Sequence, residues 1–239
     1  MSSGRIAIQQ PSYLPWLGFF DQMDYADAFY YFDDVQYTKR SWRSRNRIRC
    51  GDQILFLTVP VANAHAPLPF IKDMRILENG WRGKHLKSLT QEYRKAPHFG
   101  EVYPYVEELL RFETDNLCDL DIHVTTSLAR WIGIDTPVFR TSEIAFDDIE
   151  DNPARIVDLC RRANATFLYN GQMAKTILDG PWFKSQGITI EYQVFEHPVY
   201  SQPAPGFVSH MCILDALCCV GPKDCLGLIR SGRREPETN

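Results

Sequence analysis

The sequence predicts an α/β fold, with a Rossmann-like, largely parallel sheet, helices on both of its faces and a helical insert. Apolar runs of strand length alternate with segments of helical periodicity near both ends of the chain, a pattern typical of parallel strands joined by helices. A continuous helical pattern over residues 79–133 interrupts this alternation. With 239 residues, 44% of them hydrophobic, the chain is long enough to bury a substantial core.

We expect one domain in three parts, followed by a short tail. The parts are an N-terminal α/β half that carries the candidate site (1–78), a helical insert or cap (79–133), a C-terminal α/β half of the same domain (134–232) and a frayed polar tail (233–239).

Apolar spacing predicts the individual elements. Strands are expected at 6–10, 28–37, 54–61, 70–77, 138–144, 166–169 and 188–195. Helices are expected at 14–25, 81–95, 103–112, 116–132, 152–162 and 174–184, with a mostly helical end at 208–229. Asp151 followed by Pro153 is a good helix start, because the carboxylate can cap and proline tolerates the first turn.

Composition narrows the classes of function. The formal net charge of −4 argues against general nucleic-acid binding, which usually needs a basic surface. The opening residues MSSGR lack the apolar region of a secretory signal, and no apolar run approaches the roughly 20 residues of a membrane span. The seven cysteines lack paired CxxC spacing, so we expect thiols in a cytoplasmic protein and no zinc site.

A polar turn follows the first expected strand, at the position where open α/β sheets bind ligands. In QQPSYLPW, Gln10 and Tyr13 offer hydrogen-bonding groups and Trp16 offers a stacking face. These three residues are candidate substrate-binding residues. The alternative is a tight structural turn with core aromatics.

Carboxylates end the second expected strand, in the segment Asp33-Asp34-Val35-Gln36. Asp34 and Gln36 share one face of the strand, because side chains alternate. A carboxylate there can accept a proton or hold Mg²⁺. Asp34 and Asp33 are therefore candidate catalytic residues and Gln36 a candidate binding residue. The alternative is a cap or a partner for a nearby arginine.

A cationic loop comes next, KRSWRSRNR, and its charge contrasts with the acidic remainder of the chain. Guanidinium groups bind phosphate or carboxylate, and tryptophan stacks on rings. The candidate binding residues here are Lys39, Trp42, Arg45, Asn46 and Arg47. Arg43, Arg45 and Arg47 would share a face if the loop were extended. A solvated charge run is the alternative.

Two histidines have informative contexts. His85 lies on an expected helix and is a candidate general base, since imidazole titrates near neutral pH; a structural role is the alternative. His197 lies with Tyr200 in the loop EHPVYSQ after a strand, where binding residues gather. The sequence contains no GxSxG, GxxxxGK[ST] or GxGxxG motif.

Taken together, these residues resemble the WbqC-like family. The matching stretches are QQPSYLPWLGFFD, DDVQYTKRSWRSRNRI, LTVPV, WRGKHLKSLTQEYRKAP, ATFLYNG, HPVYSQ and GFVSHMCILDAL. The resemblance implies a bacterial protein encoded with O-antigen, surface-polysaccharide or natural-product genes, and acyl or aminoacyl transfer to amino groups. His85 and the pair Asn46-Arg47 match the family pattern, whereas Asn170 stands where the family often carries serine.

The expected function is thus a small-molecule biosynthetic transferase that moves an acyl or aminoacyl group to an amine of a phosphate-containing or carrier-linked substrate. The expected partners are a small molecule or sugar nucleotide and an acyl carrier protein, and the candidate cofactors are Mg²⁺ or a phosphopantetheine-linked donor. One alternative is a nucleotidyl or adenylate-forming enzyme that uses Mg²⁺ and a nucleoside triphosphate. The other is a non-catalytic module that binds a carrier protein or sugar nucleotide.

Overall fold

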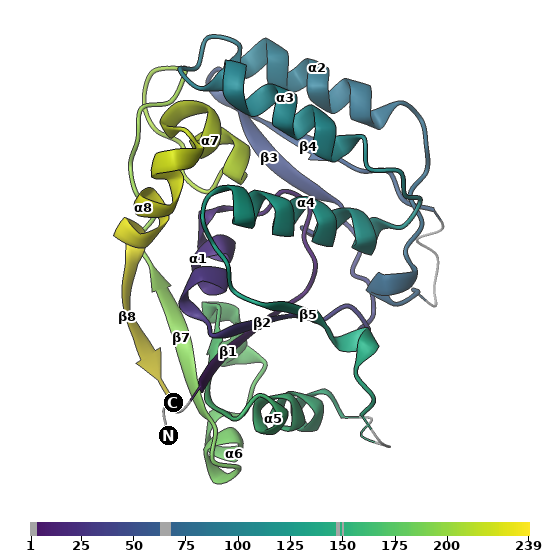
Figure 1. The fold of residues 1–239 in the computed structure, drawn as a ribbon, viewed down its shortest axis with the longest axis vertical. Coiled ribbons are helices and arrows are strands. Elements are labelled where there is room, and N and C mark those ends of the chain that lie inside the picture. Colours follow the sequence, from purple (N-terminus) through teal and green to yellow (C-terminus); the bar gives the residue numbers. More distant parts are fainter. Residues whose placement is uncertain (1–3, 63–67, 147–148, 150) are drawn as a thin grey trace.

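The computed structural model describes residues 4–62, 68–146, 149 and 151–239, and within these ranges a six-stranded sheet forms the centre of the molecule (Figure 1). The strands, in spatial order, are β5 (Val138–Arg140), β2 (Ala28–Tyr31), β1 (Gly4–Gln9), β6 (Ala165–Asn170), β7 (Thr189–Phe195) and β8 (Arg233–Thr238). The first five run parallel and β8 pairs antiparallel with β7. The expected Rossmann-like fold is confirmed.

The sheet is buried on both faces because the side chains of its central strand alternate between two apolar clusters. Ala7 of β1 packs with the cluster on one face, while Ile6 and Ile8 pack with the cluster on the other. The strand carries apolar residues at all three positions, as expected for a parallel strand covered on both sides.

Helices cover the two faces unequally (Figure 1). The larger cluster includes side chains of α1 (Leu17–Tyr25), α4 (Leu117–Trp131), α7 (Ile213–Val220) and α8 (Pro222–Gly232). The smaller cluster includes side chains of α5 (Asn152–Arg162) and α6 (Gly180–Ser185). Helix α5 begins where the sequence predicts, since Asp151 accepts a hydrogen bond from the backbone N–H of Ala154.

A separate antiparallel hairpin lies beside the larger cluster, formed by β3 (Arg45–Cys50) and β4 (Gln53–Thr58). It packs near α2 (Trp81–Tyr93) and α3 (Phe99–Leu110), which with α4 form the expected helical block. The second half of the predicted arginine loop is therefore a strand. Its inner residue Ile48 is buried, and its arginines alternate with it.

Several predicted elements differ from the structure. The strand expected at 28–37 ends at Tyr31, and the strand expected at 70–77 is replaced by the 3₁₀ helix η1 (Ile71–Asp73). The short 3₁₀ helix η2 (Thr141–Glu143) replaces the end of the strand predicted at 138–144. The 3₁₀ helix η3 (Gln172–Thr176) overlaps the start of the helix predicted at 174–184.

The tail is the clearest difference. Instead of fraying, residues 233–238 form β8 at the sheet edge. Arg233 binds Asp21 and Asp24 of α1, with Nε of Arg233 2.6 Å from Oδ1 of Asp21. Lys175 of η3 also binds Glu237. The prediction failed because backbone pairing with β7 and ion pairs with distant residues, rather than apolar spacing, hold this strand.

Two further findings concern membrane-spanning helices and the cysteines. None of the helices within the described ranges has the length and apolar character that crossing a bilayer requires. All seven cysteines lie within these ranges and are free thiols, as expected.

Candidate functional site

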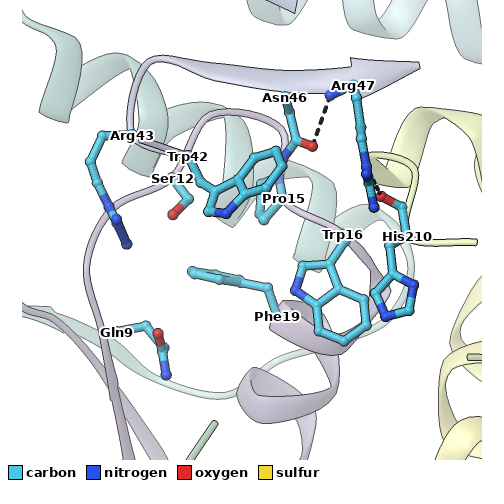
Figure 2. Close-up of a pocket in the computed structure, with 10 residues that line it drawn as sticks. All are labelled: Gln9, Ser12, Pro15, Trp16, Phe19, Trp42, Arg43, Asn46, Arg47 and His210. Carbon is cyan, nitrogen blue, oxygen red and sulfur yellow. Dashed lines mark hydrogen bonds between the residues drawn. The ribbon is translucent and has the colours of Figure 1, made fainter. Parts of the chain in front are cut away.

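A cavity of about 250 Å³ opens at the carboxyl end of β1, beside the point where the sheet order reverses (Figure 2). Gln9, the last residue of β1, donates to the side chain of Asn170, the last residue of β6, over 2.7 Å. Open α/β sheets bind ligands at such a reversal. The cavity is lined by Gln9, Ser12, Pro15, Trp16, Phe19, Trp42, Arg43, Asn46, Arg47 and His210.

Three chain segments meet at this cavity: the turn after β1, the arginine segment that leads into β3, and the start of α7. Backbone and side-chain amide hydrogen bonds hold them together. The Tyr13 N–H donates to the Trp42 carbonyl over 3.0 Å, and the Asn46 side chain donates to the Tyr13 carbonyl over 3.1 Å. From the third segment, the Ile213 N–H donates to the Pro15 carbonyl over 2.9 Å. Hydrogen bonds of backbone groups in all three segments therefore hold the cavity walls in place.

Trp16 is placed by the absence of a side chain at Gly18. A Cβ atom at Gly18 would lie 2.3 Å from Cη2 of Trp16, so only glycine lets the indole lie against the start of α1. The indole stacks on the His210 ring, with 4.8 Å between ring centroids. Leu14, two residues earlier, has a φ of 44°, a strained conformation for a leucine that turns the chain into Pro15.

His210 and His197 extend this aromatic wall, with 5.0 Å between their ring centroids. Burial lowers the pKa of His210, and the neighbouring Arg47 lowers it further. Burial also lowers the pKa of His197. The Nδ1 atom of His210 lies 2.8 Å from Oγ of Ser209, which leaves Nε2 available to a ligand. Both rings are thus mostly neutral at pH 7 and can accept a proton.

Two arginines supply the positive charge. Nε of Arg43 donates to the Pro11 carbonyl over 3.2 Å, and Nε of Arg47 donates to the His210 carbonyl over 2.8 Å. Among the described residues, no carboxylate lies within 4.0 Å of either guanidinium. Figure 2 shows the Arg43 guanidinium pointing toward the same space as Gln9 and Phe19. An arginine that binds only a carbonyl retains its charge for an anionic ligand.

A buried carboxyl lies behind Arg43. Asp121 of α4 is fully buried, and neither of its oxygens has a hydrogen-bond partner in the described part of the chain. Burial raises the pKa of this carboxyl well above its usual value, and Arg43 offsets the rise only in part. One helical turn later, Thr125 donates to the carbonyl of Ser12, a residue of the cavity wall. Because burial favours the neutral form of this carboxyl, Asp121 compensates the Arg43 charge less than an exposed carboxylate would.

A chain of side-chain amides fixes the orientation of Gln9. Asp21 can only accept, so it takes a hydrogen bond from Nε2 of Gln193 over 2.7 Å. The Gln193 oxygen then accepts from Gln22 over 2.8 Å, and the Gln22 oxygen accepts from Nε2 of Gln9 over 2.7 Å. Because Nε2 of Gln9 is used for Gln22 and Asn170, its oxygen is the group left for a ligand. The cavity floor therefore presents a hydrogen-bond acceptor.

Of the residues predicted from the sequence, Trp16, Trp42, Asn46 and Arg47 line the cavity. His197 is not part of the cavity lining but stacks on Trp16, with 6.2 Å between ring centroids.

Other predicted binding residues do not line the cavity. Tyr13 is fully buried, and the Gln10 carbonyl accepts from Ser12. Tyr200 donates to buried Asp215 over 2.7 Å. Gln36 donates to the Leu68 carbonyl over 3.3 Å.

Lys39 and Arg45 also lie outside the cavity lining. Lys39 is exposed, and the Arg45 guanidinium lies 4.9 Å from the centroid of the Phe56 ring, on the outer face of the hairpin.

The predicted catalytic carboxylates lie outside the cavity, in ion pairs. Asp33 is fully buried; burial alone would raise its pKa, but hydrogen bonds from Ser142 and the Arg140 guanidinium lower it below the usual value. Asp34 binds Arg155 and accepts from Thr141 over 2.6 Å. These contacts match the alternative in which the carboxylates serve as partners for arginines. They also do not fit a Mg²⁺ site, because the carboxylate oxygens already bind arginine and hydroxyl groups.

His85 is also used within the core. Its Nδ1 lies 3.0 Å from the Tyr13 hydroxyl and its Nε2 lies 3.2 Å from the Thr58 carbonyl. Burial lowers its pKa to about 4. The ring therefore ties α2 to β4 and to the turn after β1. Within the described ranges, no group of three or more His, Cys, Asp or Glu side chains could hold a metal ion.

Sequence reasoning missed several cavity residues. Gln9, Ser12, Pro15, Phe19, Arg43 and His210 were not among the predicted binding residues. The sequence did contain a signal for Arg43, because Arg43, Arg45 and Arg47 occur at every second position. His210 lies in GFVSHMCILDAL, a stretch that carries the family resemblance, but the sequence does not indicate that its ring would stack on Trp16.

The fold and site define a Rossmann-like α/β protein with a cationic, aromatic cavity at the carboxyl end of its central strand. The chain belongs to the WbqC-like protein family, whose model matches residues 10–226. It is similar to the uncharacterized protein Rv1507c of Mycobacterium tuberculosis, with 31% identity over 219 residues that cover 91% of this chain and 94% of that protein. No solved structure matches.

Proposed function

We propose that this protein is a biosynthetic transferase that moves an acyl or aminoacyl group to the amine of a phosphate-containing or carrier-linked small molecule. The observation that carries the proposal is the Arg43 guanidinium, which faces the cavity and binds a backbone carbonyl rather than a carboxylate. A phosphate bound there would receive the paired N–H bonds that guanidinium offers. Asp121 behind it supports this role, because burial raises the pKa of that carboxyl and so favours its neutral form.

The size and lining of the cavity support a ring next to that anion. Trp16, Trp42 and Phe19 supply apolar faces on which a sugar or base can stack. At about 250 Å³ the cavity is smaller than the roughly 300–1,000 Å³ of sites that enclose a whole drug-sized ligand. The cavity therefore holds the reacting part of the substrate, and the rest extends past Trp42 and Arg47.

The orientation of the Gln9 side-chain amide supports an amine as the substrate group that receives the acyl group. Its oxygen is the ligand-facing atom, since its Nε2 is already bonded to Gln22 and Asn170. An amine N–H can donate to this oxygen, which orients the nitrogen at the carboxyl end of β1. Asn170 supports this arrangement by accepting from Gln9.

His210 is the proton acceptor in this proposal. The amine nitrogen attacks the carbonyl carbon of a thioester donor, and the new C–N bond forms as the C–S bond breaks. Nε2 of His210 takes the proton that leaves the nitrogen and returns it to the departing thiolate, so the products are an amide and a free thiol. A neutral imidazole at pH 7 suits this step, which general-base catalysis accelerates by about 10²–10⁴-fold.

The test combines an amino-sugar nucleotide with a panel of acyl and aminoacyl thioesters and detects amide product by mass spectrometry and free thiol by colorimetry. We expect product with the wild-type protein and a loss of turnover in His210→Gln that leaves binding of the sugar nucleotide intact. Arg130→Gln, a change at an exposed residue of α4, is the control. Saturable binding without product would favour a binding module, and pyrophosphate release from ATP or CTP would favour nucleotidyl transfer; either result overturns the proposal.

A further inference from the structure

The outer face of the β3–β4 hairpin carries both charge and exposed apolar surface. The hairpin register pairs Arg45 with Thr58 and Arg47 with Phe56, so these side chains share the face. Ile54 continues this face along β4, and Trp42 extends it before β3. We call this set the hairpin face: Trp42, Arg45, Arg47, Ile54, Phe56 and Thr58.

Large apolar side chains on this face are unusually open to solvent. Trp42, Ile54 and Phe56 are 46%, 42% and 44% exposed. The Trp42 and Phe56 rings stack with 6.4 Å between centroids. Arg45 lies over Phe56 and Arg47 over Trp42, at 4.9 Å and 5.8 Å from the ring centroids. Aromatic residues and arginine are enriched at protein–protein interfaces, and this face combines both.

The charge of the face is not balanced within the protein. Some exposed arginines, such as Arg75 and Arg234, lie within 2.7 Å of a carboxylate, whereas others, such as Arg94 and Arg130, have no ion pair in the described part of the chain. In the described part of the chain, neither Arg45 nor Arg47 has a carboxylate within 4.0 Å, and exposed Lys39 has no ion pair either. In a protein of net charge −4, this basic surface is complementary to an acidic partner.

Three physical arguments narrow the class of partner. A second copy that docked face to face would set this basic surface against itself. General nucleic-acid binding needs a broader basic surface than an acidic protein offers. The hairpin face spans only about 20 Å by 10 Å, because strands rise about 3.4 Å per residue and lie about 4.8 Å apart. So small a footprint suits a transient protein contact, since stable complexes bury about 800 Å² on each partner.

The face also continues into the cavity, because Trp42 and Arg47 belong to both. We infer that the hairpin face docks an acidic carrier protein, which delivers a phosphate-linked group to the cavity beside Arg43. This inference rests on the proposed function and names the partner of the same site. The carrier-linked phosphate then lies at the cavity mouth between the two proteins, where Arg47 can bind it.

The experiment measures binding of a purified acidic acyl carrier protein, in its phosphopantetheinyl form, by fluorescence anisotropy at low salt. The test variant is the double substitution Arg45→Glu with Phe56→Asp, neither of which lines the cavity. The matched control is Arg130→Glu with Ile177→Asp, which makes the same charge change at exposed residues outside the hairpin face. We expect saturable, salt-sensitive binding that the test variant weakens by about tenfold or more and the control leaves unchanged.

Binding that is absent in the wild type, or equal in the test and control variants, overturns the inference, as does self-association through the hairpin face in sedimentation. A thermal-shift titration with pyrophosphate, run in parallel on all variants, separates the two proposals. Pyrophosphate stabilisation with no carrier binding removes the docking partner and leaves the proposed cavity chemistry. Carrier binding with no pyrophosphate stabilisation supports the docking surface and counts against the anion site.

Discussion

The Gln9 amide at the cavity floor is linked to the Asp21 carboxylate of α1 through two glutamine side chains, Gln22 and Gln193. Asp21 is itself held by Arg233 at the start of β8. The C-terminal edge of the sheet therefore supports the orientation of Gln9, together with Asn170 and with the Gly18 carbonyl, which accepts from Gln193 over 2.8 Å. A tail that the sequence suggests is frayed thus helps to support one residue of the cavity.

The first prediction tests whether Asp21 alone sets this orientation. Asp21→Asn keeps an oxygen that can accept from Gln193, and Nε2 of Gln193 is also held by the Gly18 carbonyl over 2.8 Å. We expect the preference for UDP-glucosamine over UDP-glucose, measured by calorimetry, to be retained, and the free energy of unfolding to fall by about 3 kcal/mol because a buried ion pair is lost. Arg230→Gln, which removes the neighbouring pair with Asp24, is the control for lost charge. Loss of the amine preference in folded Asp21→Asn would show that the carboxylate, rather than the Gly18 carbonyl and Asn170, sets the orientation.

The second prediction concerns the contact between Trp16 and Gly18. Gly18→Ala places a methyl group where the indole lies, so we expect a shifted tryptophan fluorescence spectrum and a loss of stability of about 1–3 kcal/mol. Gly227→Ala on α8 is the matched control, because its Cβ meets nothing within 4 Å and alanine favours helix. Equal stability gains in the two variants would contradict the close approach.

The third prediction concerns Asp121. Its pKa is raised on folding, so its contribution favours the folded state most at acidic pH and is lost as pH rises from about 3.9 toward the folded-state pKa. Asp121→Asn should therefore stabilise the protein relative to wild type by an amount that grows with pH, at up to about 1.4 kcal/mol per unit. Urea unfolding at pH 5, 6, 7 and 8 measures this difference. A difference that stays constant with pH would mean that Asp121 does not hold a proton.

The fourth prediction separates structure from catalysis at Asp34. Because the carboxylate binds Arg155 and both side chains are largely buried, Asp34→Asn should lower the free energy of unfolding by about 3 kcal/mol. Asp115→Asn breaks an exposed pair with Arg75 and should cost less than about 1 kcal/mol. Nucleotide binding to the cavity should survive both changes. If Asp34→Asn folds normally and loses turnover, the carboxylate belongs to the reaction, as the sequence first suggested.

The sequence was sufficient where the signal is local. Helix α5 begins at its predicted cap, and the apolar residues of β1 place this strand inside the sheet. The segment RNRIRC gave only the alternation of its arginines as a strand signal, because Ile48 is its one large apolar residue. The sequence showed the carboxylates of Asp33 and Asp34 but not their guanidinium partners, which lie 107 and 121 residues away.

Only those parts of the candidate site that have a local sequence signal could be predicted. The turn after β1 and the arginine segment are each visible in the sequence, and their hydrogen bonds to each other follow from the fold. His210 joins them from the other end of the chain, through the bridge between Trp16 and Cys212. Periodicity carries no information about contacts of this kind, which depend on the tertiary structure.

The most direct test of the central claim is the affinity of Arg43→Gln for a nucleoside diphosphate, measured by calorimetry against wild type and against Arg45→Gln. Arg45 lies outside the cavity on the same hairpin and controls for the loss of one positive charge. Removing a guanidinium bond to phosphate should weaken binding by about 10- to 100-fold, while Arg45→Gln should leave it nearly unchanged. Equal affinity in all three proteins, or no binding to any of them, would contradict an anion site at Arg43.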